Sequence, residues 1–267
     1  MHLAPRFSTV VATVLVAFLL GGCAGLHPAD EVSALLPADA VLLGEQHDAT
    51  EHQQAHARVV RTLASRGQLS ALVVEMADAG QTTAGLPPQA DEAAVRQALQ
   101  WNDKAWPWAA YGPAVMAAVR AGVPVLGGNL PRARFGPVMQ DTGLDALLPP
   151  PALAAQQEAI RLGHCDLLPA TQLAPMARIQ IARDQSMART VQAAARPGQV
   201  AVLLAGSAHV DRELGVPRHL PPGFQVRAVR LQAGGPVAPS PAFDAVWSTP
   251  AVPANDHCAA LRQRMGG

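Results

Sequence analysis

Lysine is nearly absent from this chain of 267 residues, because Lys104 is the only lysine among 20 basic residues. Aspartate and glutamate also number 20, so the formal net charge is zero. The arginines form no cluster along a stretch of chain that is typical of a nucleic-acid groove. We therefore expect no nucleic acid among the partners of this protein.

Long apolar segments are also missing. The run from Val10 to Leu20 spans about 11 residues, which is too short for a helix that crosses a bilayer. It follows the single positive charge of Arg6 and is typical of the apolar core of a signal peptide. Leu20-Gly21-Gly22-Cys23 closes the run and resembles the lipobox of bacterial lipoproteins.

The lipobox implies that residues 1–22 are a signal peptide and that Cys23 carries lipid. Residues 23–37 would then be an anchor and linker, which join the membrane to a domain at 38–261. Ala24 follows the cysteine, where an aspartate commonly marks retention in the inner membrane. We therefore expect a lipid-anchored protein of the bacterial cell envelope, in the outer membrane and facing the periplasm or the cell surface.

Cysteine is scarce, with three residues in the chain. If Cys23 carries lipid, Cys165 and Cys258 remain as an even pair in an oxidising compartment. A disulfide is the natural interpretation of this pair, and metal ligation is the alternative.

The body of the chain repeats one pattern, in which a short run rich in valine and leucine ends in polar residues and a helical stretch follows. Continuous apolar runs of this length are typical of strands that are buried on both faces of a parallel sheet. The predicted strands begin with the runs at 40–43, 71–74, 123–126 and 200–205, and a run at 226–231 is expected to add an edge strand.

Helices are expected at about 50–65, 112–120 and 173–195, between the predicted strands. The alternation of strands and helices predicts an α/β fold with a mostly parallel sheet flanked by helices. The stretches around 85–110 and 133–170 are rich in proline and alanine. They indicate helical insertions, which would form a smaller subdomain or a lid.

Polar side chains follow four of the predicted strands. Glu45, His47, Glu75, Asn129 and His209 all lie within a few residues of a strand end. Ligands of open parallel sheets bind beyond the carboxyl ends of the strands, where such residues converge. We therefore expect these five residues to line one crevice.

Two imidazoles with carboxylates suit a divalent transition metal such as zinc. His47, Glu75 and His209 would ligate the ion and leave an open position for an activated water, with Glu45 as general base. The alternative is a buried hydrogen-bond network without a metal. His52 and His56 stand four residues apart and share a helix face, which we expect to be solvated because Gln53 and Gln54 accompany them.

Tyr111 is the only tyrosine of the chain. Its phenol could ligate ferric haem, as tyrosine does in catalase. It could instead pack a helix start among neighbouring tryptophans and bond to the backbone. His164, beside Cys165, could likewise be a haem or metal ligand on the insertion, or a residue that merely flanks a disulfide.

The order of these segments resembles the ChaN-like family of bacterial lipoproteins over roughly residues 38–261. The segments that carry the resemblance are Gly44-Glu45-Gln46-His47-Asp48, Glu75, Tyr111-x-Pro113, Asn129-Leu130-Pro131-Arg132, Gly163-His164-Cys165-Asp166-Leu167-Leu168-Pro169, Gln180-x-x-Arg183-Asp184-x-x-Met187-Ala188, Gly206-Ser207-Ala208-His209-Val210 and Asp256-His257-Cys258-x-x-Leu261.

This resemblance implies a haem-binding lipoprotein associated with iron uptake. The ligand in this family is a tyrosine, which would be Tyr111 here, and the residues themselves offer His164 as a second candidate. Arg132 or Arg134, on the loop beyond the third predicted strand, could meet the propionates, and the protein could form a homodimer. The wider superfamily includes the Tiki proteases, in which two Gly-x-x-His segments and a glutamate form a hydrolytic metal site. The alternative function is therefore a metal-dependent hydrolase that uses Glu45, His47, Glu75 and His209.

Overall fold

The computed structural model describes residues 28–235, 240–253 and 256–265. The predicted signal peptide and the predicted lipidation site at Cys23 lie outside these residues. Among the described helices, none is both long enough and apolar enough to cross a membrane.

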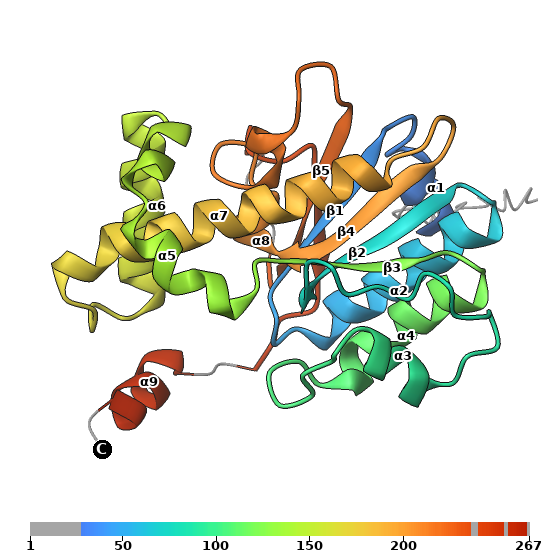
Figure 1. Ribbon diagram of the computed structural model, residues 1–267, viewed down its shortest axis with the longest axis horizontal. Helices are drawn as coiled ribbons and strands as arrows, with labels where there is room; N and C mark the ends of the chain where they lie inside the picture. The colour runs from blue at the N-terminus through green and yellow to red at the C-terminus, as the bar shows by residue number, and fades with distance from the viewer. Residues whose placement is uncertain (1–27, 236–239, 254–255, 266–267) are drawn as a thin grey trace, which may run out of the picture.

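A six-stranded sheet forms the centre of the molecule (Figure 1), and all of its strand pairs are parallel. The strand order is β3-β2-β4-β1-β5-β6. The bounds of the strands are β1 Ala40–Glu45, β2 Leu69–Asp78, β3 Val125–Asn129, β4 Val200–Gly206, β5 Val226–Ala233 and β6 Ala245–Thr249. The predicted α/β fold is therefore confirmed.

The prediction that residues 226–231 form an edge strand is wrong. β5 covers this segment and pairs with β1 on one side and with β6 on the other. β3 forms one edge of the sheet, and the other edge is β6, with the sequence Ala-Val-Trp-Ser-Thr. This strand is only half buried and lacks a continuous apolar run, so it gave no sequence signal of a strand.

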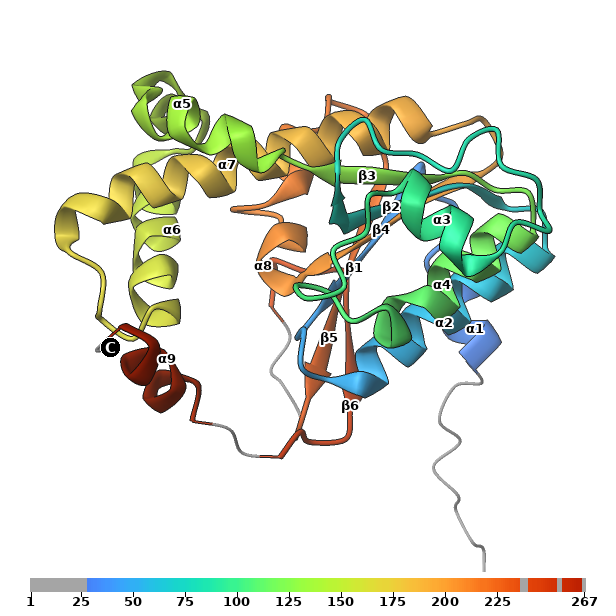
Figure 2. The same cartoon turned by 60° about the horizontal axis from the view of Figure 1, so that its bottom comes forward.

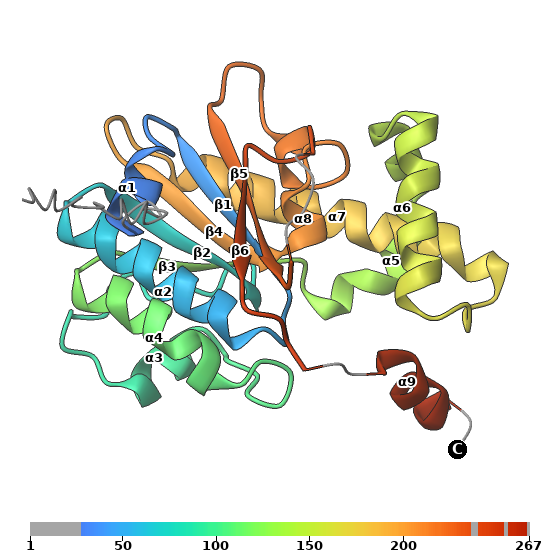
Figure 3. The same ribbon diagram turned by 180° about the vertical axis from the view of Figure 1, so that it is seen from behind.

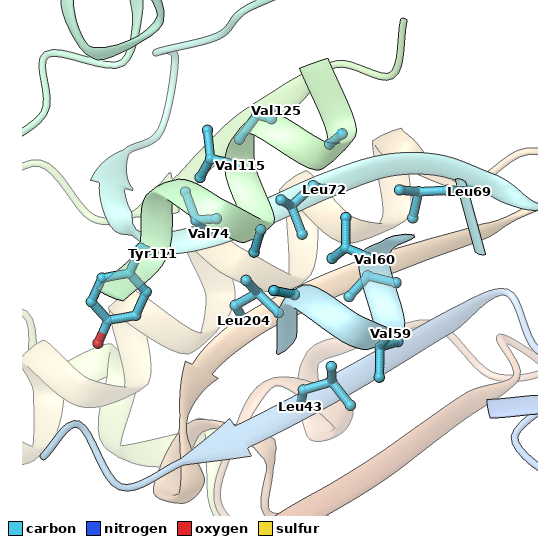
Figure 4. Close-up of a cluster of buried hydrophobic side chains, with 14 of the residues drawn as sticks. Leu43, Val59, Val60, Leu69, Leu72, Val74, Tyr111, Val115, Val125 and Leu204 are labelled. Carbon is cyan, nitrogen blue, oxygen red and sulfur yellow. The ribbon is translucent and has the colours of Figure 1, made fainter. Parts of the chain in front are cut away.

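Helices cover both faces of the sheet (Figures 1 and 3) because successive strand residues point to opposite sides. One face packs against α1 (Pro28–Ser33), α2 (Thr50–Ser65), α3 (Glu92–Ala98) and α4 (Trp108–Arg120). Figure 4 shows part of this core, in which Leu43, Leu72 and Leu204 of the strands meet Val60 and Val115.

The other face of the sheet packs mainly against the long helix α7, Ala170–Ala194. Leu42, Val73 and Leu203, which alternate with the residues of the first core, meet Met187 and Val191 here. The short helix α8 (Ser207–Val210) and the 3₁₀ helix η3 (Val216–His219) complete this layer.

A helical arm extends beyond the carboxyl ends of the strands (Figures 1 and 2). It comprises η1 (Arg132–Arg134), α5 (Phe135–Gln140), η2 (Thr142–Leu147), α6 (Pro150–Gly163) and the first turns of α7. The predicted insertion at 133–170 corresponds to this arm, whereas the stretch at 85–110 contains α3. The last helix, α9 (His257–Met265), lies beside the far end of α6.

Candidate functional site

A cavity of about 360 Å³ lies between the carboxyl ends of the central strands and the helical arm. A larger cavity, of about 550 Å³, lies at the opposite, amino ends of the strands and is lined by residues such as Gln68 and Gln225. The smaller cavity holds most of the predicted site residues. Its lining comprises Glu45, Gln46, His47, Glu75, Gln156, Ala159, Ile160, Gly163, His164, Gln180, Arg183, Asp184, Gly206, Ser207, Ala208 and His209.

Glu45 ends β1 and is buried. Its Oε1 accepts hydrogen bonds from the Tyr111 hydroxyl at 2.6 Å and from His47 Nδ1 at 2.7 Å. Its Oε2 accepts from Gln53 Nε2 at 2.8 Å. Burial opposes ionisation of the carboxyl, but these bonds and the nearby imidazoles outweigh it and lower the pKa of Glu45. The carboxylate is therefore ionised, and both of its oxygens are occupied.

Glu75 lies where the pairing of β2 with β3 becomes irregular, between Val74 and Asp78. Gly127 permits this close approach, since a Cβ at that position would lie 2.0 Å from the Asp78 carbonyl oxygen. Such irregularities change the direction of a side chain. Here the Glu75 carboxylate accepts from Arg183 Nη2 at 2.5 Å and from the Gly206 backbone N–H at 2.7 Å.

The charges around Glu75 stabilise its ionised form. Burial of this carboxyl opposes ionisation, but His209, Arg183 and His47 outweigh it and lower the pKa of Glu75 to about 2. Arg183 also donates to Asn129 at the end of β3, so one guanidinium links two strand ends to α7. This network is held in place by charge-assisted hydrogen bonds.

His47 and His209 lie at the same cavity. His47 is partly exposed and packs its ring edge-on against Trp106, with the ring centroids 4.8 Å apart. Burial opposes its protonation, yet the bond to Glu45 and the charge of Glu75 outweigh burial and raise the pKa of His47. His209 bonds to Asp184 through Nδ1 at 2.6 Å, and its Nε2 lies 3.6 Å from Glu75 Oε1.

Gly206 lies between the hydrogen-bond network of Glu45 and His47 and that of Glu75. A Cβ at this position would lie 3.0 Å from His47 Nε2 and 3.7 Å from Glu75 Oε2. Because glycine has no side chain, it leaves room for an imidazole and a carboxylate beside the end of β4. The predicted convergence on one crevice agrees with this geometry for Glu45, His47, Glu75 and His209. Asn129 lies outside the lining of the cavity and accepts a hydrogen bond from Arg183.

His164 reaches the cavity from the arm. It follows the last residue of α6, and its Nδ1 lies 2.8 Å from the Ile160 carbonyl oxygen. A carbonyl can only accept, so Nδ1 carries a proton and donates this bond. Nε2 makes no hydrogen bond to any of the described residues, so it is the nitrogen through which the neutral imidazole could ligate a metal ion.

Tyr111 is not among the residues that line the cavity, although it contacts Glu45, which is. Its side chain is buried, and its hydroxyl donates to Glu45 as it points away from the apolar core in Figure 4. Burial and the charge of Glu45 raise the pKa of Tyr111, so its phenolate is disfavoured. The phenol packs beside Trp101 and Trp106, and its hydroxyl bonds to a side chain rather than to the backbone. Ligation of haem by Tyr111 stays a prediction.

The expectation that His52 and His56 form a solvated helix face is wrong. Both imidazoles are buried because α2 turns this face toward the end of β1. His52 accepts from the Gln46 backbone N–H and contacts the Thr249 hydroxyl. His56 lies 3.5 Å from Glu45 Oε2, and neither of its nitrogens has a hydrogen-bond partner within the described part of the chain.

Arg132 lies on η1 and is exposed, outside the lining of the cavity. The arginine at the site is Arg183, which reasoning from strand ends alone missed because it lies in the middle of α7. A signal was present, since Gln180, Arg183 and Asp184 are polar residues at helical spacing within a largely apolar helix.

The predicted metal site is not organised in this structure. Over residues 28–235, 240–253 and 256–265, no three side chains of histidine, cysteine, aspartate or glutamate are arranged to hold a metal ion. The carboxylates of Glu45 and Glu75 accept hydrogen bonds at both of their oxygens instead. Arg183 also places a fixed positive charge where a metal ion would bind.

The carboxyl ends of the parallel strands and the helical arm thus enclose a cavity with histidines on both of its sides, where open parallel sheets bind their ligands. A family model described as haem-binding uptake, Tiki superfamily, ChaN matches residues 32–220. The match covers well over half of the chain, so the protein belongs to this family. No curated protein matches the chain significantly.

The chain is also similar to solved structures. The structure of ChaN of Campylobacter jejuni, described as showing cofacial haem binding, is 24% identical with a TM-score of 0.64, and the match covers 78% of this chain and 87% of that one. A structure of the type III effector HopBA1 is 16% identical with a TM-score of 0.48, over 84% of this chain and 94% of that one.

Proposed function

We propose that this protein binds haem in the cavity at the carboxyl ends of the strands, and that His164 Nε2 is the axial ligand of the iron. The observation that carries this proposal is the uncommitted Nε2 of His164 in the lining of the cavity. Imidazole is a common axial ligand of haem iron. The function of the family and the cofacial haem binding of the Campylobacter jejuni ChaN support the choice of haem.

The rest of the cavity suits the other parts of a haem. Its volume lies in the range of pockets that hold small molecules and cofactors. Ala159, Ile160 and Ala208 offer apolar contacts to a macrocycle. His47, whose raised pKa favours the cationic imidazole, is the cavity residue best placed to meet a propionate.

Haem titration of the protein, followed at the Soret band, tests the assignment of the ligand. We expect His164→Ala to lose the spectrum of histidine-ligated haem and to bind haem more weakly, and added imidazole to restore the spectrum. Tyr111→Phe is the control, because it removes only the phenol oxygen, and its spectrum should match that of the wild type. An unchanged spectrum in His164→Ala together with a shifted one in Tyr111→Phe would return the role to Tyr111.

A measurement of bound zinc in the same protein tests the hydrolase alternative. A zinc hydrolase would bind one zinc per chain and lose it when His47 and His209 are both replaced by alanine. The positive charge of Arg183, which is paired with Glu75, and the hydrogen bonds already made to both carboxylates count against this function. Wild-type protein that binds stoichiometric zinc but no haem would establish the alternative.

We also propose a homodimer that brings two haem sites together. Cofacial haems lie face to face, so one flat side of each haem must be open to the other. Leu162, which is 57% exposed, lies two residues before His164 and offers an apolar contact for a second copy. Light scattering should show a dimer with haem, and Leu162→Arg should give a monomer.

The proposed location of this domain is the outer membrane, to which lipid on Cys23 would attach it. The lipobox at residues 20–23 supports this assignment. Haem uptake is consistent with a protein that is held at the cell envelope.

A further inference from the structure

Two links join α9 to the segment that carries His164. A disulfide connects Cys165 to Cys258, with their Cα atoms 5.6 Å apart. His257 Nε2 lies 3.1 Å from the Gly163 carbonyl oxygen, and it donates because a carbonyl can only accept. The two links attach to the residues immediately before and after His164, although the disulfide spans 93 positions of sequence.

The segment between α6 and α7 adopts an unfavourable backbone conformation. Cys165 and Asp166 both have positive φ angles, 57° and 60°, and neither is glycine. Such residues persist in the left-handed region when the surrounding structure holds them there. The disulfide restrains Cys165 directly, so α9 supplies part of this support.

The direction of His164 depends on the same segment. Its Nδ1–H bonds to Ile160 in the last turn of α6, and this bond orients Nε2 for a ligand. If residues 163–166 relax, the imidazole loses its fixed position relative to the cavity.

We propose that α9 is a clasp that positions His164, and that its disulfide makes haem affinity dependent on thiol reduction. This inference rests on the proposed haem site. A dithiol reductant would transfer two electrons and two protons, breaking the S–S bond into the thiols of Cys165 and Cys258 while it becomes a disulfide itself. Both cysteines are only half buried, so a small dithiol can reach them.

His257 is a positioning residue in this scheme, since it acts on His164 through the Gly163 carbonyl. Loss of a partner that orients a metal ligand typically lowers affinity roughly 10–100-fold. We therefore expect haem affinity to fall by roughly this factor when the disulfide is reduced, and by less when only the His257 hydrogen bond is removed.

Haem titration of the oxidised and the dithiol-reduced protein tests the clasp. Cys258→Ser should behave like the reduced wild type and should no longer respond to dithiol. His257→Ala should weaken binding and alter the ligand-field spectrum, whereas Arg262→Ala, an exposed change on the same helix, should do neither. Thermal unfolding by circular dichroism shows whether each variant keeps the fold.

Hydrogen exchange without haem gives a second measurement that does not depend on haem binding. The amides of residues 163–167 should exchange faster in the reduced protein and in Cys258→Ser, while those of the central strands stay protected. Equal exchange and equal haem affinity in the oxidised and reduced forms would overturn the clasp and leave the haem site intact. No haem binding by the oxidised protein would refute the proposed function, and exchange alone would then decide whether α9 holds the segment.

Discussion

The two buried histidines of α2 should respond to the same substitution in opposite ways. His52 and His56 lie one turn apart on the same helix face, and both are buried. His52 has a hydrogen-bond partner at each nitrogen, whereas His56 has none at either nitrogen among the described residues. We expect His56→Leu to leave stability unchanged or to raise it, and His52→Leu to lower it.

The magnitudes follow from burial. Replacing an unsatisfied buried polar group by an apolar one of similar size is nearly neutral or stabilising, so His56→Leu should gain about 0–2 kcal/mol at pH 7.5. His52→Leu leaves the Gln46 N–H without its acceptor and should cost about 1–3 kcal/mol.

The pH dependence gives a further signature. Burial lowers the pKa of His56 from 6.5 to about 4, against the opposing effect of Glu45. Because the folded-state pKa lies below the unfolded-state value, the unfolded chain binds more protons between pH 6.5 and 4. Stability therefore falls as the pH falls through this window. The difference of about 2.5 units corresponds to about 3 kcal/mol, which His56→Leu should abolish.

Urea unfolding of the wild type and both variants at pH 7.5, 5.5 and 4.5 measures these effects. The wild type and His52→Leu should both lose stability toward pH 4.5, and His56→Leu should lose less. A loss of more than about 2 kcal/mol in His56→Leu at pH 7.5 would show that His56 makes a strong bond to Glu45, which lies 3.5 Å away. The reasoning from an unpaired imidazole would then be refuted.

Three other changes test the site and the anchor. Arg183→Met should cost about 3–5 kcal/mol by chemical denaturation, because it leaves Glu75 buried without its cation. Since the folded-state pKa of Glu75 is about 2, below 4.5, its stabilisation is present above pH 4.5 and is lost toward pH 2. This acid-induced loss should shrink in Arg183→Met, and an unchanged pH profile would contradict the assignment. Gly206→Ala places a Cβ 3.0 Å from His47 Nε2 and should weaken haem binding in a Soret titration more than Gly136→Ala, where the added Cβ meets open space. Cys23→Ser should abolish incorporation of labelled palmitate and leave uncleaved precursor, and undiminished label would contradict the lipid anchor.

The sequence alone determined most of the sheet. The apolar runs of β1, β2 and β4 are continuous because these strands lie inside a parallel sheet and are buried on both faces. Strand β3 lies at an edge of the sheet, but its first residues, Val125 and Leu126, belong to an apolar run that predicted it. Helix α2 was also predicted correctly, at 50–65. Strand β6 was missed because its residues are only half buried and it has no continuous apolar run.

The convergence of Glu45, His47, Glu75 and His209 followed from the same local logic, since the carboxyl ends of parallel strands share one edge. The partners of these side chains did not follow from it. Tyr111, Arg183 and Gln53 come from three different helices, and a helix shows in its sequence which face is apolar but not which atom that face will meet. Only tertiary packing turned Tyr111 and Gln53 toward Glu45 and Arg183 toward Glu75.

The burial of His52 and His56 and the position of His164 were likewise decided by the tertiary structure. Glutamines beside a histidine indicate polar surface in the sequence, but Gln53 is buried because Glu45 satisfies its amide. His164 lies on an arm whose first segments have little periodicity, and the packing of that arm on α7 brings its imidazole to the cavity. The local sequence encodes which residues are apolar. Contacts between distant segments determine which polar groups find a hydrogen-bond partner and which do not.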